Sequence, residues 1–309
     1  MDSLALRFSG HQSFALRNTW LTKGVLASEK NPRIFSAPDA LVTLGVGKNM
    51  VESIRYWCQA TQMIRDVPGA RGAYEVSPWG RHFFCGGSAW DPYLEDTATL
   101  WFVHWLLATN VSCAGTIYYA FNELHAAEFT RASLERDVGA FAELHEARTT
   151  LNTIRRDVGV FIRNYLGGAD RADSPPEDAL DCPLVELGLL VQGANGLLFS
   201  FQRGPKPSLS DAVFVAAMAE FAKRSGESGE RTLSFDDAAY APCSPGRVFR
   251  LDEAALAERL ERVEGLTGGA WSYTETTGLR QVLLRDDVDA TQVLEAYYRR
   301  GTEEGRRGR

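Results

Sequence analysis

The chain has 309 residues, of which 45% are hydrophobic and 24% are charged, a composition typical of folded soluble proteins and not of disordered ones. Glycine shows no period and no heptad pattern persists, which excludes collagen and coiled-coil folds. Residues 1–90 carry ten Lys/Arg and six Asp/Glu, whereas the rest carries 23 and 34, for a net charge of −7 overall. A basic N-terminal region on an acidic body is typical of a protein that presents one surface to a polyanion.

The chain carries no pattern of a membrane or secreted protein. Its most apolar run, Leu100–Ala108, is far shorter than the ~20 residues of a spanning helix, and we find no secretory signal. The five cysteines are scattered without C-x-x-C spacing, which favours neither a zinc site nor a disulfide framework. We therefore expect a cytoplasmic protein that does not associate with membranes.

Residues 36–60 predict two helices joined by a tight turn. Ser36, Pro38 and Asp39 are typical of a helix start, and Gly45-Val46-Gly47 interrupts the pattern where a left-handed backbone is needed. The second helix then has apolar residues on one side. Its other side carries the candidate DNA-binding residues Lys48, Asn49, Arg55 and Tyr56. This arrangement is typical of a helix-turn-helix, whose second helix contacts the DNA groove.

Two short extended segments follow that helix, at Met63-Ile64 and at 74–76, on either side of a glycine-rich turn. The order of helices, strand, turn and strand predicts a winged helix-turn-helix. Arg65 and Arg71 lie in the predicted wing and are candidates for phosphate contacts. Winged helices also serve as protein-binding modules, so this alternative stays open.

The remainder of the chain predicts helices at 96–109, 116–124, 132–144 and 151–166, a Pro/Gly/Asp-rich linker at 167–178, and a second helix-and-wing unit. In that unit we expect strands at 196–201, 271–275 and 281–284, an extended segment at 248–249, and helices at 211–224, 252–263 and 289–298. The predicted fold class is mainly α with small β wings (α+β). The predicted regions are 1–90 (winged-helix DNA-binding), 91–168 (helical, packed on the first), 178–300 (winged-helix-like) and 301–309 (a disordered basic tail).

The opening motif, residues 8–20, packs polar side chains closely around Gly10. His11 is a candidate general acid or base because imidazole titrates near neutrality. Ser13 is a candidate nucleophile if a base reaches it, and Arg17 is a candidate for neutralising phosphate or a transition state. The alternative is a hydrogen-bonded cap that pins the N-terminal segment onto the winged helix.

The chain resembles a family of unknown-function proteins from bacterial DNA modification clusters. The resemblance is carried by the motifs FSGHQSFALRNTW (8–20) and LVTLGVGKNMVESIRYW (41–57). The best-known branch of this family is the SspB-like proteins of single-strand DNA phosphorothioation (Ssp) defence systems. Further similarity lies at Glu95-Asp96 with Trp101, from Thr150-Leu151 through Arg156-Asp157-Val158, at 244–246 and at 277–279. It therefore spans nearly the whole chain.

The resemblance implies a DNA-nicking endonuclease that cuts one strand of double-stranded DNA so that sulfur can enter the backbone. It also implies a cysteine desulfurase and ATP-dependent enzymes as partners. Carried over residue by residue, it marks His11, Gln12 and Arg17 for catalysis or phosphate contact, and Lys48, Asn49, Arg55 and Tyr56 for DNA docking.

The sequence gives weaker signals for metal ligands and for the oligomeric state than for the fold. Phosphodiester cleavage commonly uses carboxylates that hold divalent metal, but no convincing ligand set occurs in the sequence. We therefore name no metal ligands, and a requirement for Mg²⁺ or Mn²⁺ stays open. A non-catalytic winged-helix adaptor or regulator that recruits the sulfur-transfer enzymes is the alternative function. A homodimer is favoured over a monomer because dimers are common among such proteins.

Overall fold

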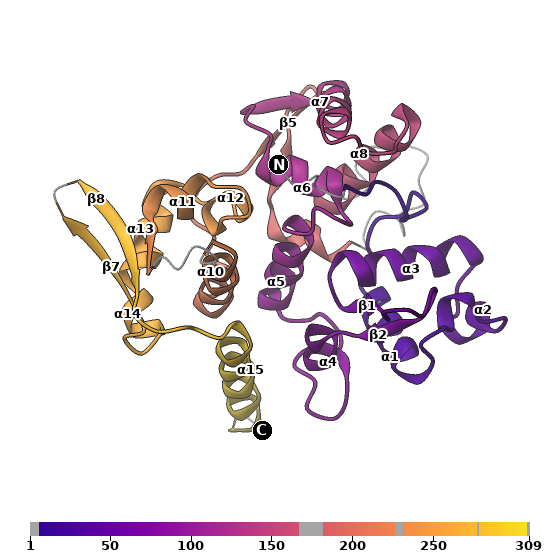
Figure 1. Ribbon diagram of the computed structural model, residues 1–309, viewed down its shortest axis with the longest axis horizontal. Helices are drawn as coiled ribbons and strands as arrows, with labels where there is room; N and C mark the ends of the chain where they lie inside the picture. The colour runs from indigo at the N-terminus through magenta and orange to yellow at the C-terminus, as the bar shows by residue number, and fades with distance from the viewer. Residues whose placement is uncertain (1–5, 167–181, 226–230, 277, 308–309) are drawn as a thin grey trace. The chain divides into compact units, whose positions relative to one another are not determined.

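Helices alternate with short antiparallel strands throughout the computed structural model, which describes residues 6–166, 182–225, 231–276 and 278–307. The chain divides into two units, the first ending at Phe201 and the second beginning at Gln202. Figure 1 shows the elements of each unit. The α+β class predicted from the sequence is confirmed. Within the described residues, no helix has both the length and the apolar content needed to cross a bilayer.

The first unit begins with helices grouped around a hairpin (Figure 1). Its elements are α1 (Trp20–Lys30), a 3₁₀ turn η1 (Ile34–Ser36), α2 (Ala40–Leu44), α3 (Lys48–Ala60), β1 (Ile64–Asp66), β2 (Tyr74–Val76) and α4 (Pro78–Phe84). Helix α2 is capped at its C-terminal end by Gly45, whose φ of 66° is left-handed, and α3 begins three residues after this glycine. The predicted pair of helices with a glycine turn is confirmed. The first of them begins later than expected, because Ala37 is extended, as a residue before proline prefers to be.

The two strands β1 and β2 pair antiparallel, with Ile64 opposite Val76 and Arg65 opposite Glu75. Ile64 and Val76 are buried, so this side of the hairpin packs on the helices while Arg65 points to solvent. The predicted strands near 64 and 74–76 are therefore present.

The helical region contains α5 (Thr97–Ala108), α6 (Gly115–Asn122), α7 (Arg131–Leu144) and α8 (Leu151–Leu166), close to the predicted ranges. Every residue of α5 except Thr97 is buried, because a helix that is apolar on all sides is stable only inside a core. Helix α8 is two-sided in its first half: Ile154 and Val158 are buried, whereas Asn152, Arg155 and Arg156 are exposed.

A three-stranded sheet closes the first unit and corrects the predicted domain boundary. Its strands are β3 (Glu128–Thr130), β4 (Leu190–Gln192) and β5 (Leu198–Phe201), in the order β3-β5-β4. Strand β5 pairs with β3, which precedes α7, so residues up to 201 belong with the helical region. The boundary is therefore at 201/202 and not at the predicted linker. That linker, residues 167–178, lies outside the described residues.

The second unit contains α10 (Asp211–Ser225), β6 (Thr232–Ser234), α11 (Phe235–Tyr240), α12 (Pro245–Val248), α13 (Glu253–Glu261), α14 (Val263–Leu266), β7 (Trp271–Thr276), β8 (Leu279–Leu284) and α15 (Ala290–Arg307). Its sheet has the order β6-β8-β7. The extended segment predicted at 248–249 is instead the end of a helical turn, because Ser244 caps it and Pro245 begins it. The helix predicted at 252–263 is divided into α13 and α14. Helix α15 continues to Arg307, so the tail expected to be disordered is helical up to that residue, and 308–309 lie outside the described residues.

Candidate functional site

The opening motif forms a loop with an unusual backbone. Ser9, Gln12 and Ser13 have φ values of 67°, 47° and 67°, and Gly10 has a φ of 114°. Left-handed backbone at non-glycine residues costs on the order of 1–3 kcal/mol each. Such a loop persists only where contacts around it fix its shape.

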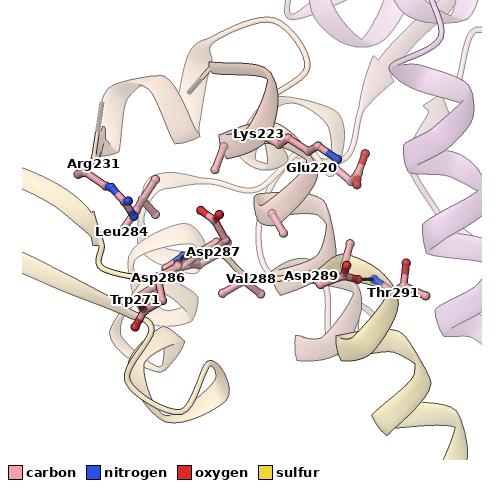
Figure 2. Close-up of a pocket in the computed structure, with 13 residues that line it drawn as sticks. Glu220, Lys223, Arg231, Trp271, Leu284, Asp286, Asp287, Val288, Asp289 and Thr291 are labelled. Atoms are coloured by element: carbon pink, nitrogen blue, oxygen red, sulfur yellow. Dashed lines mark hydrogen bonds between the residues drawn. The ribbon is translucent and has the colours of Figure 1, made fainter. Parts of the chain in front are cut away.

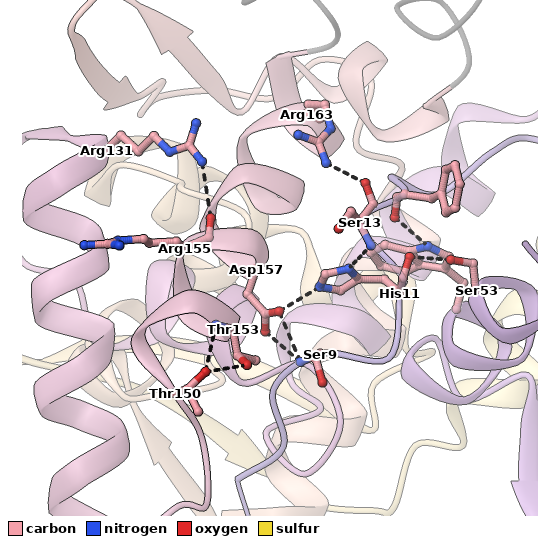
Figure 3. Close-up of polar contacts among 12 residues, drawn as sticks. Ser9, His11, Ser13, Ser53, Arg131, Thr150, Thr153, Arg155, Asp157 and Arg163 are labelled. Carbon is pink, nitrogen blue, oxygen red and sulfur yellow. Dashed lines mark hydrogen bonds and ion pairs between the residues drawn. The ribbon is translucent and has the colours of Figure 1, made fainter. Parts of the chain in front are cut away.

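His11 supplies the central contact of this loop (Figure 3). Its Nε2 lies 2.8 Å from Oδ1 of Asp157 on α8, and the main-chain N–H of Ser13 donates to its Nδ1 at 3.2 Å. Because Nδ1 accepts, we assign the neutral tautomer in which Nε2–H donates to Asp157. Asp157 also accepts from the main-chain N of Ser9, at 2.9 and 3.1 Å.

Helix α3 encloses the other side of the ring. Tyr56 meets the imidazole edge to face at 5.3 Å between centroids, and Trp57 stacks on it at 6.2 Å. Ser53 donates its hydroxyl to the His11 carbonyl, and Nε1 of Trp57 donates to the carbonyl of Phe14 at 3.2 Å. The loop is thus held between α3 and α8.

This geometry gives His11 a structural role in the observed conformation. The residue is only 3% exposed, and both of its ring nitrogens are hydrogen-bonded within the protein. The arrangement matches the hydrogen-bonded cap considered as the alternative in the sequence analysis. For His11 to move a proton to or from a substrate, one of these two hydrogen bonds would have to break.

Gln12 and Arg17 reach the surface where His11 does not. Gln12 is exposed and donates to Glu52 of α3. The half-buried Arg17 places its guanidinium 5.8 Å from the ring centroid of Phe14 and 5.4 Å from that of Trp20. Of the predicted catalytic group, Gln12 is therefore exposed, Arg17 is half-buried and His11 is buried.

The predicted DNA-binding residues of α3 divide into two sets. Lys48 and Asn49 are exposed at the beginning of the helix, and the half-buried Arg55 lies 3.4 Å from the hydroxyl of Tyr74. The placement of Tyr56 on the exposed face was wrong, because the opening loop covers it and leaves it 4% exposed. Burial, with Cys113 and Asp157 nearby, raises its pKa well above 10, so its phenol stays neutral.

The two arginines predicted in the wing are exposed. Nε of Arg65 lies 2.6 Å from Glu75 on the neighbouring strand. Arg71 is in the turn between the strands, and its carbonyl accepts from Arg33 at 3.1 Å. The structure thus brings Lys48, Asn49, Arg65 and Arg71 to the surface of the same small helix-and-hairpin region.

Asp157 is the site residue that the sequence analysis did not assign. A signal for it was present, since it lies on the same helical face as Ile154, Val158 and Phe161. A carboxylate on an apolar face is rarely buried without a partner. Across the described ranges, no group of three or more His, Cys, Asp or Glu side chains is close enough to hold a metal ion.

The second unit has a hollow of about 550 Å³ beside α10 and the beginning of α15 (Figure 2). Its lining mixes Lys223 and Arg231 with Glu220 and several aspartates of the segment 286–289. Asp289 caps α15 by accepting from the main-chain N of Thr291 at 2.7 Å. The hollow contains none of the residues predicted for the site, and its mixed charge selects no ligand.

The chain is similar to proteins of one family over nearly its whole length. The model of a family described as protein of unknown function (DUF4007) matches residues 8–298. A crystal structure of SspB is 32% identical with a TM-score of 0.84, covering 96% of this chain and 89% of that one. A magnesium ion-bound crystal structure of SspB is 32% identical with a TM-score of 0.82, covering 94% and 87%. No curated protein matches the chain.

Proposed function

This chain is an SspB-like member of the DUF4007 family, and from that premise we propose that it is the DNA-nicking component of a phosphorothioate modification and anti-phage defence system. The observation that carries the proposal is the likeness to SspB over almost the entire chain. Nicking one strand would open the backbone so that sulfur can replace a non-bridging oxygen. A cysteine desulfurase and ATP-dependent enzymes would be its partners.

The DNA-docking part of the proposal rests on α3 and the hairpin after it. Helices α2 and α3, the glycine turn between them and the β1–β2 hairpin have the order of a winged helix-turn-helix. Lys48 and Asn49 are exposed at the N-terminal end of α3, where the helix dipole also favours an anion. We assign this end of α3 to the groove, and Arg65 and Arg71 to the phosphates.

The chemical part of the proposal rests on the opening loop. Arg17 would stabilise the charge that develops on the phosphoryl oxygens during cleavage, and Gln12 would hydrogen-bond the same group. His11 and Asp157 would hold the loop that carries both side chains. His11 is therefore a positioning residue in this scheme unless the loop opens.

The proposal leaves open whether cleavage requires magnesium. One of the similar SspB structures is magnesium-bound, but the described residues of this chain contain no cluster of metal-ligating side chains. The residues seen here therefore do not fit a preformed metal site, and we derive no step through a metal.

The alternative, a DNA-binding adaptor without catalysis, is favoured by one observation. The histidine marked for catalysis is buried and has both ring nitrogens engaged. An adaptor would use the same α3 surface to hold DNA while partner enzymes modify it.

Incubation of the full chain with supercoiled plasmid separates the two functions. Reactions with and without Mg²⁺ or Mn²⁺ are scored for open-circle DNA, at low salt where phosphate contacts are strongest. Arg17→Gln removes the guanidinium proposed to stabilise the developing charge, and Lys48→Ala removes a docking charge. His11→Ala serves as the positioning variant, with its folding checked by thermal unfolding.

A nickase predicts open-circle DNA from the wild type, with little from Arg17→Gln even at enzyme concentrations that saturate the DNA. An adaptor predicts a gel shift without open-circle product under every metal condition. Absence of both a gel shift and open-circle product would contradict both functions.

A further inference from the structure

One face of α8 carries a row of arginines, of which Arg155 and Arg156 are exposed and Arg163 is half-buried. Arg155, Arg156 and Arg163 lie at positions that share one side of a helix, and Arg131 of α7 faces them. The side chains of Arg131 and Arg155 are 52% and 61% exposed. Figure 3 shows Arg131, Arg155 and Arg163 on these helices, beside the His11–Asp157 contact.

Two of these guanidinium groups converge over Gly159. A Cβ at Gly159 would lie 3.0 Å from Nη2 of Arg131 and 3.6 Å from Nη1 of Arg163. The two nitrogens are therefore no farther apart than the sum of these distances, although they belong to different helices. Like charges this close repel each other, and an anion between them would relieve the repulsion.

Main-chain carbonyl groups supply several of the contacts that hold these arginines. Nη2 of Arg163 donates to the carbonyl of Ser13 at 2.7 Å, and Nη2 of Arg131 donates to that of Arg155 at 3.3 Å. The carboxylate of Glu135 pairs with both Arg131 and Arg155, at 3.0 Å and 3.7 Å from their Nε atoms. Carbonyl groups orient a guanidinium without cancelling its charge, and Arg131 and Arg155 share the one carboxylate of Glu135, so these two side chains keep an excess of positive charge.

The glycine at position 159 leaves room for the two guanidinium groups beside α8. Glycine in the middle of a helix is less stable than alanine, and at Gly159 the atoms that an added methyl group would meet are those of Arg131 and Arg163. The glycine thus lets two arginines approach the helix. The planar fork of a guanidinium matches the oxygens of a phosphate group.

We propose that Arg131, Arg155, Arg156 and Arg163, the arginine surface, bind backbone phosphates of DNA as a contact separate from α3. This inference rests on the proposed function in that it takes DNA as the ligand. Through Arg163 and Ser13 the surface is joined to the opening loop. A phosphate bound there would fix the strand beside Gln12.

The test measures binding of the full chain to a fluorescently labelled duplex by anisotropy over a series of salt concentrations. Each phosphate contact contributes about 0.9 to the slope of log affinity against log salt. The double variant Arg131→Gln/Arg155→Gln should lower the slope by roughly 1–2 and the affinity at low salt about tenfold. The matched control is Arg136→Gln, which removes an arginine of α7 that is paired with Asp137, and it should bind like the wild type.

Gly159→Ala tests the same surface without removing a charge. Its methyl group displaces the guanidinium of Arg131, so DNA affinity should fall while the melting temperature stays equal or rises. Lys48→Ala reports on the α3 surface in the same assay.

Two results would overturn the inference, and they have different consequences for the proposed function. If the wild type binds and Lys48→Ala weakens binding, but the arginine variants match Arg136→Gln, the arginine surface does not bind DNA and the proposed function stands. If the wild type binds no DNA at all, the proposed function fails together with the inference.

Discussion

His11 and Asp157 are 146 residues apart in the sequence, yet their side chains meet at 2.8 Å in a buried contact. Asp157 belongs to the apolar face of α8, and His11 belongs to a loop with left-handed backbone. The same loop is covered by Tyr56 and Trp57 of α3. This one contact therefore joins the predicted DNA-docking helix to the arginine-bearing helix α8.

Removing the carboxylate should destabilise the first unit. Asp157→Ala leaves the buried Nε2–H of His11 without its acceptor and also removes the acceptor of the main-chain N–H of Ser9. We expect this to cost roughly 3 kcal/mol of unfolding free energy. Urea unfolding measures the loss, and a double-mutant cycle with His11→Ala isolates the pair. Asp137→Ala, on the surface of α7, is the control and should change stability by less than about 0.5 kcal/mol. Equal effects of the two aspartate substitutions would contradict this account.

Gly10 should not accept a side chain. Its φ of 114° is unfavourable for other residues, and a Cβ there would lie 2.6 Å from Cδ2 of Tyr56. Gly10→Ala should therefore lower the unfolding free energy by more than about 2 kcal/mol. Gly87→Ala is the matched control, because its Cβ would meet nothing within 4 Å. A wild-type melting temperature for Gly10→Ala would show that the loop adopts another shape.

Much of the helical framework could be predicted because long periodic segments carry a strong signal. Helices α7 and α8 were expected from their apolar spacing and lie close to the predicted ranges. Strands β3 and β4 were missed because three residues are too few to show an alternating pattern. Strands β1 and β2 are equally short, but the glycine-rich turn between them gave a separate signal. The pairing of β3 with β5 joins segments about 70 residues apart, and that long-range contact set the domain boundary.

The candidate site was only partly predictable for a related reason. Periodicity correctly placed Lys48 and Asn49 on an exposed surface, because no segment in the described part of the first unit covers them. It misplaced Tyr56, since the loop that buries this residue comes from outside the helix. Asp157 belongs to a segment that resembles the family, but its role depends on a loop that no local pattern connects to α8.

Alkaline pH should destabilise the protein through two buried tyrosines. Burial raises the pKa of Tyr56 and of Tyr165 well above 10 in the folded state. The folded state then holds protons that the unfolded chain loses above about pH 10, so stability is full below that pH and falls as the pH rises further. Urea unfolding at a series of pH values measures this. Tyr165→Phe should flatten the decline, whereas Tyr93→Phe, at an exposed position, should leave it unchanged; a decline of the same steepness in both variants would contradict the assignment.

The two sets of α3 residues should differ in their effect on DNA. Lys48→Ala removes an exposed charge at the beginning of the helix, so affinity should fall for all duplex sequences and the salt slope should drop by about 1. Tyr56→Phe keeps the ring that packs on His11 and changes nothing on the surface, so the affinity should stay within about twofold of the wild type. Anisotropy titrations of both variants with one duplex make the comparison. A large loss of affinity in Tyr56→Phe with unchanged folding would mean that the opening loop moves aside when DNA binds, which would also expose the imidazole of His11 to the substrate.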